Sequence, residues 1–435
     1  MRVLGIGHHN ALGDLYLRLL ERGHEVRVYM SDAEAHDILA GLVPRCDDYR
    51  AELAWVRAAG DDGIVLFECT GYGALQDTLR AEGYRVVGGS ALGDRLELDR
   101  AYGQSVARAL GMSTAATHAF AGFDAALAFL DASPGRYVLK FDGDEFAKTR
   151  NYVGVLDDGE DMRVMLRMQR AQWLHSETPS IVLMEHLSGV EVGVGGFFDG
   201  ARFLRPVNLD WEHKRFFPGN LGELTGEMGT LVTYRDGDRL FDATLGRLAP
   251  QLAASGYVGY INLNLIVNER GAFPLEFTCR LGVPGFAILS ALHVDPWDRL
   301  LARLVTRDAP ELATHPGYAV GVVLTVPPFP YADGYERLSK GMPIGISRIA
   351  IADRARLHFG EVRAEGDLLV TAGSIGYVMV VTGRGANVGA AREHCYALAA
   401  QVIVPNVRYR RDIGEAFEQR DHAELMRLGW LDAPR

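Results

Sequence analysis

Three polar side chains alternate along one short stretch in the second half of the chain. They are Glu276, Thr278 and Arg280, and they follow the apolar pair Pro274 and Leu275. If the stretch is extended, alternation places the carboxylate, the hydroxyl and the guanidinium on one face. Such a set can hold a hard cation and the phosphate oxygens that the cation bridges. A surface strand with an ordinary Glu–Arg pair is the alternative interpretation.

Lysine is rare in this chain, since only four of its 45 lysines and arginines are lysines: Lys140, Lys148, Lys214 and Lys340. In a chain this rich in arginine, each lysine indicates a position where a compact, flexible ammonium group could be needed. Lys140 lies in a predicted strand over 136–143, and Lys148 follows a polar turn. Two such cations suit a polyphosphate clamp with a closing loop. Two solvated surface lysines are the alternative.

A second cationic run lies beside glycines. His213, Lys214 and Arg215 precede the segment 219–229, which is too rich in glycine for an ordinary helix. Backbone amides and cations there could approach an anionic ligand. Glu191 follows a predicted strand over 180–187 and could bind ribose hydroxyls, with a bare turn acid as the alternative.

An antiparallel hairpin is predicted to position the stretch that carries Glu276, Thr278 and Arg280. A predicted strand over 257–267 carries Asn262 and Asn264, and a turn at 268–271 joins it to Glu276. Asn264 and Glu276 then face one site.

The N-terminal part reads as a parallel α/β layer of about 90 residues. Ligands of such sheets bind beyond the carboxyl ends of the strands, so 7–13 and 69–73 share one rim, and the helix that starts there could receive an anion. Gly5 and Gly7 alone do not make a dinucleotide fingerprint. The predicted strands cover 2–7, 24–29, 62–68 and 84–89, and the predicted helices cover 12–20 and 75–82.

Helices and short strands alternate through the remainder, which ends in an α+β part from about 317. The predicted helices cover 91–110, 240–255, 284–307 and 390–402, with a helix–strand transition over 119–130. Further predicted strands cover 192–198, 201–204, 320–326, 346–350, 357–360, 368–372 and 377–382.

Composition narrows the class of protein. A chain of 435 residues, 48% hydrophobic and 23% charged, forms two or three ordinary globular domains. A net charge of -11 argues against nucleic acid as a partner, and no apolar run is long enough to cross a membrane. The N-terminus lacks the pattern of a secretory signal, so a cytoplasmic location is expected. The four cysteines are scattered and suggest neither disulfides nor zinc.

Taken in order, these motifs resemble the phosphoribosylamine–glycine ligase family of purine biosynthesis, within the ATP-grasp superfamily. The resemblance covers nearly the whole chain. The matched segments are Lys140 with Lys148, Met184–Glu191, His213–Arg215, Gly226-Glu227-Met228-Gly229 for the family's Gly-Gly-Met-Gly, Glu276–Gly282 for its Glu-Phe-Asn-Cys-Arg-Phe-Gly, and Arg410–Gly414.

The resemblance implies a mixed α/β and α+β architecture with an ATP-grasp fold. An N-terminal parallel α/β domain is expected over 1–98, an ATP-grasp domain over 99–316 with a lid lobe at 113–190, and a C-terminal α+β domain over 317–435. ATP and Mg²⁺, or Mn²⁺ in its place, are the expected cofactors, with ATP held between two lobes.

The implied activity is ATP-dependent carboxylate–amine ligation through an acyl phosphate, with release of ADP and phosphate. Expected partners are a small-molecule carboxylate, glycine or another amino acid, and an amine, bound to a monomer or homodimer. The resemblance implies that the catalytic residues are Arg280, Lys214 and Arg215. The implied ATP-binding residues are Lys140, Lys148, Glu185, His186, Leu187 and Glu191. The implied metal ligands are Glu276, Asn264 and Thr278, and the implied substrate-binding residues are Gly7, His8, His9, Asn10, His213, Met228 and Gly229.

Several departures from the family pattern leave alternatives open. The family's Gly-rich first loop, which cradles a sugar phosphate, is replaced by His8-His9-Asn10, and the usual Asn metal ligand is Thr278. The family's Gly-Asp-Pro-Glu has become 282–285, without either carboxylate. One alternative is a specialised paralogue that ligates an amino acid to another amine, in secondary metabolism or nucleotide modification. The other is a degenerate nucleotide-binding protein without ligase activity.

Overall fold

The structure is a computed structural model that describes residues 1–141, 152–173, 180–308 and 310–432. The chain divides into a larger unit, 1–112 with 190–435, and a smaller unit, 113–189. The domain bounds given above stay a prediction.

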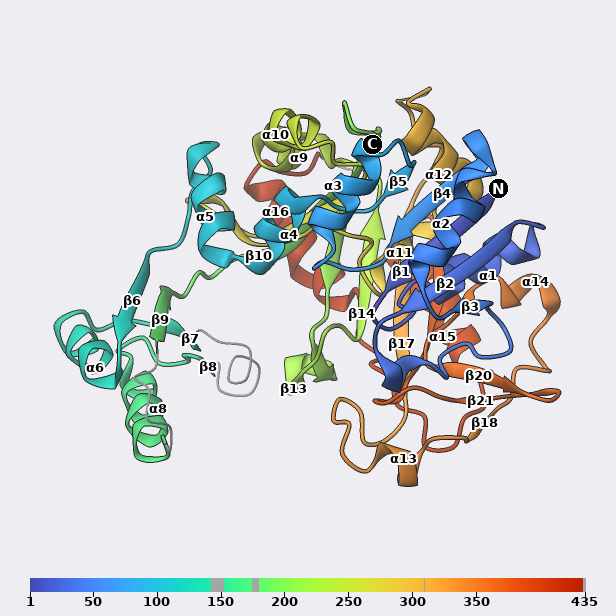
Figure 1. Ribbon diagram of the computed structural model, residues 1–435. Helices are drawn as coiled ribbons and strands as arrows, with labels where there is room; N and C mark the ends of the chain where they lie inside the picture. The colour runs from blue at the N-terminus through green and yellow to red at the C-terminus, as the bar shows by residue number, and fades with distance from the viewer. Residues whose placement is uncertain (142–151, 174–179, 309, 433–435) are drawn as a thin grey trace. The chain divides into compact units, whose positions relative to one another are not determined.

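A parallel sheet opens the larger unit, with the strand order β3-β2-β1-β4-β5 in the described part of the chain (Figure 1). The central strand β1 is buried almost throughout and pairs in parallel with β2 and β4. This confirms the predicted parallel layer, although β3 and α2 were not predicted. The strands are β1 Arg2–Gly7, β2 Glu25–Met30, β3 Arg45–Cys46, β4 Gly63–Phe67 and β5 Val86–Val87, with helices α1 Gly13–Glu21, α2 Tyr49–Arg57 and α3 Gly73–Ala81.

The helix predicted over 91–110 is two helices, α4 Ala91–Leu98 and α5 Arg100–Ala109. The break falls at Asp99, whose carboxylate accepts a hydrogen bond of 2.9 Å from the backbone N–H of Tyr102. An aspartate in this position starts a new helix by capping it.

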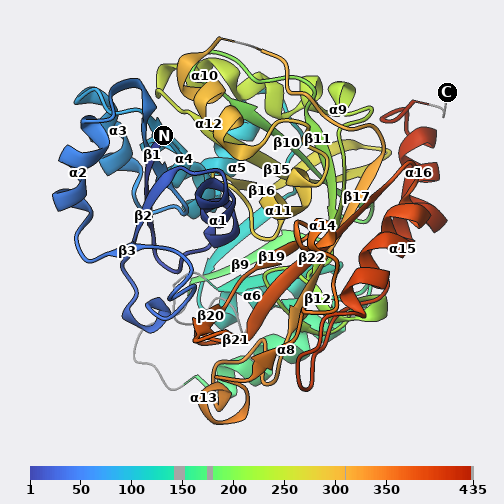
Figure 2. The ribbon, with the colours of Figure 1, turned by 90° about the vertical axis from the view of Figure 1, so that its right-hand side faces the viewer.

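A long antiparallel sheet, here called the large sheet, follows in the order β16-β15-β10-β11-β14-β17-β22-β19 among the described residues (Figure 2). It joins strands from both sides of residue 316, because β14 pairs with β17. Its strands are β10 Val190–Phe198, β11 Asn208–Glu212, β14 Gly229–Thr233, β15 Gly259–Asn268, β16 Gly271–Thr278, β17 Tyr318–Thr325, β19 Leu357–Phe359 and β22 Tyr377–Gly385.

Helices cover both faces of the large sheet. Gly321 lies directly under the side chain of Ile288 in α11 (Gly285–Ser290). Gly383, which points to the opposite face, lies under the backbone of α15 (Val388–Ala399). A side chain at either glycine would collide with its helix, so both helices sit unusually close to the strands.

The predicted hairpin that carries Asn264 and Glu276 is confirmed. Asn264 pairs with Glu276, and Asn262 pairs with Thr278, across β15 and β16. The register shifts just after Asn264, where a bulge interrupts the ladder.

Other predicted elements differ in detail. The helix predicted over 240–255 is interrupted, and the strand predicted over 346–350 is wrong, since turns occupy those residues. Residues 201–204 form one bridge, Phe198 to Phe203, and no strand. The remaining elements of the larger unit are α9 Asp238–Ala243, α10 Ala249–Ala254, α12 Trp297–Thr306, α13 Tyr335–Leu338, α14 Ile351–Arg354, α16 His422–Arg427, the hairpin of β12 Arg215–Phe217 and β13 Leu221–Leu224, and a sheet of β18 Pro343–Ile344, β21 Leu368–Thr371 and β20 Val362–Glu365.

The smaller unit is an antiparallel sheet in the order β6-β9-β7-β8 with two described helices. Leu139 and Leu183 bury one face of the sheet against Leu130 of α6 and Leu166 of α8. Alternation therefore turns Lys140 to the other face. The elements are β6 Thr117–Ala121, α6 Phe123–Ala132, β7 Tyr137–Phe141, β8 Tyr152–Val153, α8 Glu160–Ala171 and β9 Ser180–Glu185.

Among the residues that the structure describes, no helix has both the length and the apolar character needed to cross a bilayer.

Candidate active site

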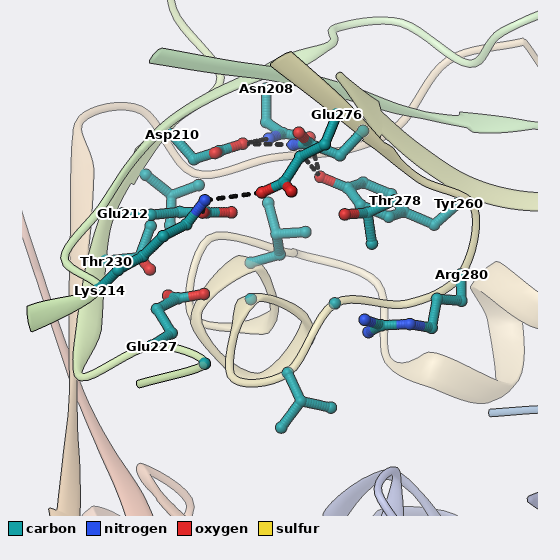
Figure 3. A pocket seen from close by; sticks show the side chains of 17 residues that line it. Asn208, Asp210, Glu212, Lys214, Glu227, Thr230, Tyr260, Glu276, Thr278 and Arg280 are labelled. Atoms are coloured by element: carbon teal, nitrogen blue, oxygen red, sulfur yellow. Dashed lines mark hydrogen bonds and ion pairs between the residues drawn. The ribbon is translucent and has the colours of Figure 1, made fainter. Parts of the chain in front are cut away.

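One face of the large sheet carries a polar cavity of about 180 Å³ (Figure 3). Strands supply it with alternate residues, as the period of two requires. The strand residues that line it are Asn208, Asp210, Glu212, Thr230, Val232, Tyr260, Asn262, Glu276 and Thr278. Loops and α11 add Lys214, Gly226, Glu227, Arg280, Gly282, Val283, Gly285 and Leu289.

Glycines in β10 allow the polar side chains of the neighbouring strands to meet. A Cβ atom at Gly193 would come within 2.0 Å of Oδ1 of Asp210, and one at Gly195 within 2.1 Å of the Tyr260 hydroxyl. The strand lies between β11 and β15, so the missing side chains leave room for groups to reach across it.

A buried hydrogen-bond network fills that room. Asn262 and Asn208 both donate from Nδ2 to Oδ2 of Asp210, at 2.6 and 2.9 Å. The hydroxyl of Tyr260 donates to Oδ1 of Asn208 at 3.1 Å. Burial raises the pKa of Asp210 to about 8, and the nearby charge of Glu212 acts in the same direction.

Lys214 is surrounded by carboxylates. Its Nζ lies 2.7 Å from Glu276, 3.2 Å from Glu212 and 3.5 Å from Glu191. The pKa of Lys214 is raised because these charges outweigh the burial of the ammonium. Burial also raises the pKa of Glu212, against the attraction of Lys214.

Glu227 faces the same cavity from the segment before β14. Its pKa is raised well above the ordinary value, first by burial and then by the charges of Glu212 and Asp210. Four carboxylates and two cations, Lys214 and Arg280, line the cavity among the described residues. The cavity is therefore acidic on balance.

Arg280 approaches the cavity from the side opposite Glu227, and the two side chains point toward each other in Figure 3. Its Nε lies 3.2 Å from Oε1 of Glu97, whose other oxygen accepts the backbone N–H of Cys279 at 2.6 Å. The backbone and the guanidinium are thus fixed by one carboxylate. Glu97 and Arg280 also line a second cavity on β16.

The predicted metal ligands lie on the neighbouring strands β15 and β16, but they are not equally available to a metal ion. Glu276 and Thr278 line the cavity, and Glu276 is paired with Lys214. Asn264 donates from Nδ2 to Glu191 at 2.9 Å, and its Oδ1 accepts the N–H of Leu265 at 3.0 Å. These are oxygen donors of the kind that Mg²⁺ binds, so the set fits a hard divalent ion chemically. No group of three or more His, Cys, Asp or Glu residues in the described chain is arranged to hold a metal.

Other predicted residues of this region lie away from the cavity. His213 is buried, and burial lowers its pKa to about 4, with Arg410 as the next cause. Its Nε2 accepts the N–H of Gly414 at 3.4 Å. Met228 is fully buried among aromatic residues, and Gly229 packs against Gly321 and Ile413. The guanidinium of Arg215 donates to the carbonyl of Gly222 at 2.8 Å.

The predicted substrate loop follows β1. A Cβ at Gly7 would lie 2.5 Å from the carboxylate of Glu68. His8 contacts the Ser31 hydroxyl at 2.6 Å, and His9 lies 3.2 Å from Asp32. Asn10 adopts the left-handed region (φ 57°), which asparagine tolerates better than most residues.

A buried carboxylate occupies the start of α1. Glu68 follows β4, is 1% exposed, and accepts the N–H of Ala11 at 2.7 Å through Oε2. Burial raises its pKa to about 7. The anion site expected at this rim stays a prediction, and an anion bound there would lie near Glu68.

In the smaller unit, Lys140 pairs with Val182 across β7 and β9. Glu185 ends β9 beside Ala116, Leu187 is buried, and burial lowers the pKa of His186. Lys148 lies outside the described residues. The structure thus brings Glu276, Thr278, Arg280 and Lys214 together at the cavity, with Glu191 beside Lys214.

No role was predicted from the sequence for Asp210, Glu212, Glu227, Thr230, Glu68 or Glu97. One signal was present: Asn208, Asp210, Glu212 and Lys214 are polar at every second position, as on one face of a strand. The partners of Glu68 and Glu97 come from distant segments, and no local pattern marks them.

Comparison with known proteins agrees with this architecture. The family of the phosphoribosylglycinamide synthetase ATP-grasp (A) domain matches residues 98–286. A crystal structure of phosphoribosylamine–glycine ligase from Thermotoga maritima superposes with a TM-score of 0.68 at 23% identity, over 95% of this chain and all of that one. The chain has an ATP-grasp fold. A biotin carboxylase complex from Campylobacter jejuni, 12% identical, superposes with a TM-score of 0.62 over 98% of each chain.

The ATP-grasp chain also resembles phosphoribosylamine–glycine ligases in sequence. It is 29% identical to that of Corynebacterium ammoniagenes over 358 residues, which are 79% of this chain and 80% of the relative. It is 27% identical to that of Mycobacterium bovis over 398 residues, 88% of both. The matched ATP-grasp domain contains every polar residue of the cavity.

Proposed function

We propose that this chain is an ATP-dependent carboxylate–amine ligase of the phosphoribosylamine–glycine ligase type. The observation that carries the proposal is the cavity, where Arg280, Lys214 and Glu276 meet inside the matched ATP-grasp domain. A guanidinium and an ammonium beside carboxylates suit a reaction in which phosphoryl charge must be held and moved.

The reaction has two steps. A carboxylate oxygen of the substrate attacks the γ-phosphorus of ATP, the bond to the β-phosphate oxygen breaks, and ADP leaves. The nitrogen of a neutral amine then attacks the acyl carbon, phosphate leaves with the bonding electrons, and the nitrogen loses a proton. The product is an amide, and one ATP gives one ADP and one phosphate.

Several residues in and around the cavity have distinct parts in this scheme. Arg280, fixed by Glu97, stabilises the negative charge on the transferring phosphoryl group. Glu276, with Thr278 and Asn264, would hold the divalent ion, which supplies charge neutralisation to the phosphates when bound. Lys214 keeps the acidic strands together by bridging Glu276, Glu212 and Glu191. Lys140, Lys148, Glu185, His186, Leu187 and Glu191 stay the proposed nucleotide residues.

Glycine and phosphoribosylamine are the first substrates to test, because the relatives carry that name. A ligase that uses a different amine is the second candidate. One observation favours it: the segment that leads into α1, beside which an external anion would bind, already holds the carboxyl group of Glu68. When Glu68 is ionised, a second negative group there would meet electrostatic repulsion.

Isotope transfer tests the ligase chemistry directly. With ¹⁸O in the substrate carboxylate, an acyl-phosphate route moves one ¹⁸O atom into the released phosphate, detectable by mass spectrometry. We expect ADP release that depends on both carboxylate and amine, with labelled phosphate. Tight ATP binding without turnover across the substrates tested would favour the degenerate binding protein.

Growth of a strain that lacks the purine-pathway ligase then separates the two substrate candidates. Rescue by this chain supports phosphoribosylamine as the amine. Failure by a folded chain that turns over ATP with another amine supports the second candidate. The divalent ion, the oligomeric state and the cellular location stay predictions.

A further inference from the structure

We propose that Glu227, assisted by Asp210 and Thr230, is a specificity-determining residue that binds the ammonium group of the amino-acid substrate in the acidic cavity of the large sheet. This inference rests on the proposed function, because it assigns a recognition residue for a substrate of that ligase. The carboxylate of that substrate faces Arg280.

Three side-chain oxygens of the cavity are buried and lack hydrogen-bond partners among the described residues. They are Oδ1 of Asp210, Oε1 of Glu227 and Oγ1 of Thr230. Asp210 is 6% exposed and Thr230 is 2% exposed. A buried acceptor without a partner is costly, and all three residues line the same cavity. A bound donor group would satisfy these three oxygens.

An ammonium group supplies that donor better than other candidates. It has three N–H groups, which equals the number of unpartnered oxygens, and its charge offsets the carboxylates. Lys214 cannot fulfil this role, because its ammonium already pairs with Glu276, Glu212 and Glu191.

The position of the cations defines the other end of the substrate. Figure 3 shows Arg280 and Glu227 on opposite sides of the cavity, each directed inward. A small amino acid can place its carboxylate at the guanidinium and its ammonium at Glu227. The raised pKa of Glu227, caused mainly by burial, agrees with a carboxyl group that lacks its cationic partner.

Calorimetric binding to the full chain tests the proposal. Pairs of isosteres that differ in the ammonium group are titrated in the presence of a non-hydrolysable ATP analogue and Mg²⁺. Glycine is compared with glycolate, and β-alanine with 3-hydroxypropionate. Diaminobutyrate and ornithine show whether the ammonium belongs to the α-carbon or to a side chain. The variants are Glu227→Gln and Asp210→Asn, with Glu223→Gln in β13 as a matched control outside the cavity.

We expect the ammonium member of the preferred pair to bind at least tenfold more tightly than its hydroxyl isostere. Glu227→Gln reduces that preference by about tenfold, whereas Glu223→Gln leaves it unchanged. Preference for diaminobutyrate and ornithine over glycine assigns the ammonium to a side chain.

Equal binding of the hydroxyl isosteres to the wild-type chain would overturn the proposal, whatever the variants do. An unchanged preference in folded Glu227→Gln and Asp210→Asn would also overturn it. These outcomes are independent of turnover, so a chain that binds the amino acid but fails the isotope test contradicts the ligase proposal and keeps this one as a binding property.

Discussion

The acidic cavity of the large sheet and the rim of the parallel sheet both bury carboxyl groups, yet these groups have different surroundings. At the rim, Glu68 accepts the backbone N–H of Ala11 at the start of α1. In the cavity, Asp210 accepts two side-chain amides, and Glu227 faces open space. Each of the three keeps one oxygen without a described partner, but only Asp210 and Glu227 line the cavity.

At the rim, the carboxyl group of Glu68 is bound by the backbone of the protein. In the cavity, Asp210 and Glu227 each present an oxygen that a ligand could bind. The Glu68 carboxyl group accepts the N–H of Ala11, two residues before α1, so it lies close to where an anion would meet the N-terminus of this helix. The cavity has an excess of acceptors and a guanidinium on its far side. We therefore expect changes in the cavity to alter chemistry, and changes at the rim to alter stability and its pH dependence.

Replacing Arg280 with alanine gives the largest expected effect. Loss of the guanidinium removes charge stabilisation from the transferring phosphoryl group, so ADP release falls by about 10³-fold or more. Steady-state ADP release measures this, and chemical denaturation checks that the variant is folded. Arg95→Ala, an exposed arginine that stacks on Tyr102, is the control and keeps normal turnover. Normal turnover in folded Arg280→Ala would remove the role assigned to this residue.

Replacing Glu68 with glutamine tests the rim. Burial raises the pKa of Glu68 from 4.5 to about 7. The contribution of the neutral carboxyl to stability is complete below pH 4.5 and is lost as pH rises through 7, since the unfolded chain ionises first. The wild-type chain thus loses up to about 3 kcal/mol relative to Glu68→Gln between pH 4.5 and 8. Glutamine still accepts the N–H of Ala11 and does not titrate.

Urea denaturation at pH 5 and pH 8 measures this difference. Glu82→Gln, at the exposed end of α3, serves as the control and follows the pH dependence of the wild type. A stability gap between wild type and Glu68→Gln that is the same at both pH values would show that Glu68 is charged in the folded chain. The pH dependence expected at the rim would then be absent.

Gly193→Ala tests whether the glycines of β10 create the polar network. A Cβ there would lie 2.0 Å from Oδ1 of Asp210, so Asp210 or β10 must shift. We expect a loss of about 1–3 kcal/mol in unfolding free energy, together with weaker substrate binding. Gly226→Ala, where a Cβ meets nothing within 4 Å, is the matched control. Denaturation curves that are equal for the two variants would contradict this explanation.

The sequence predicted the part of the site that depends on local pattern. Glu276, Thr278 and Arg280 alternate along one strand and its continuation, and the hairpin with Asn264 follows from a turn of four residues. Alternation and turn chemistry are local, so they can be read without the fold. The predicted parallel layer was confirmed for the same reason.

The rest depends on contacts between distant segments. Glu68 ends the pattern of a buried strand, and its partner Ala11 lies 57 residues away. Asp210 belongs to a run of mixed charges that resembles a solvated surface, but β11 lies inside the large sheet. Gly193 creates space that no sequence pattern reveals. Burial of these groups is a tertiary property, and it sets their pKa values and their need for partners.

Lys340→Gln gives the smallest expected effect. It compares a lysine near solvent with Lys214 in the cavity. Lys340 pairs with Asp37 at 3.1 Å and with Glu336 at 3.0 Å, at a partly exposed position. Ion pairs near solvent contribute little, so we expect a loss of about 0.5 kcal/mol and unchanged ADP release. Lys214→Gln instead leaves Glu276, Glu212 and Glu191 without their shared ammonium, and both stability and turnover fall further. Equal losses in the two variants, measured by urea denaturation, would mean that the ammonium in the cavity is no more important to the fold than one near solvent.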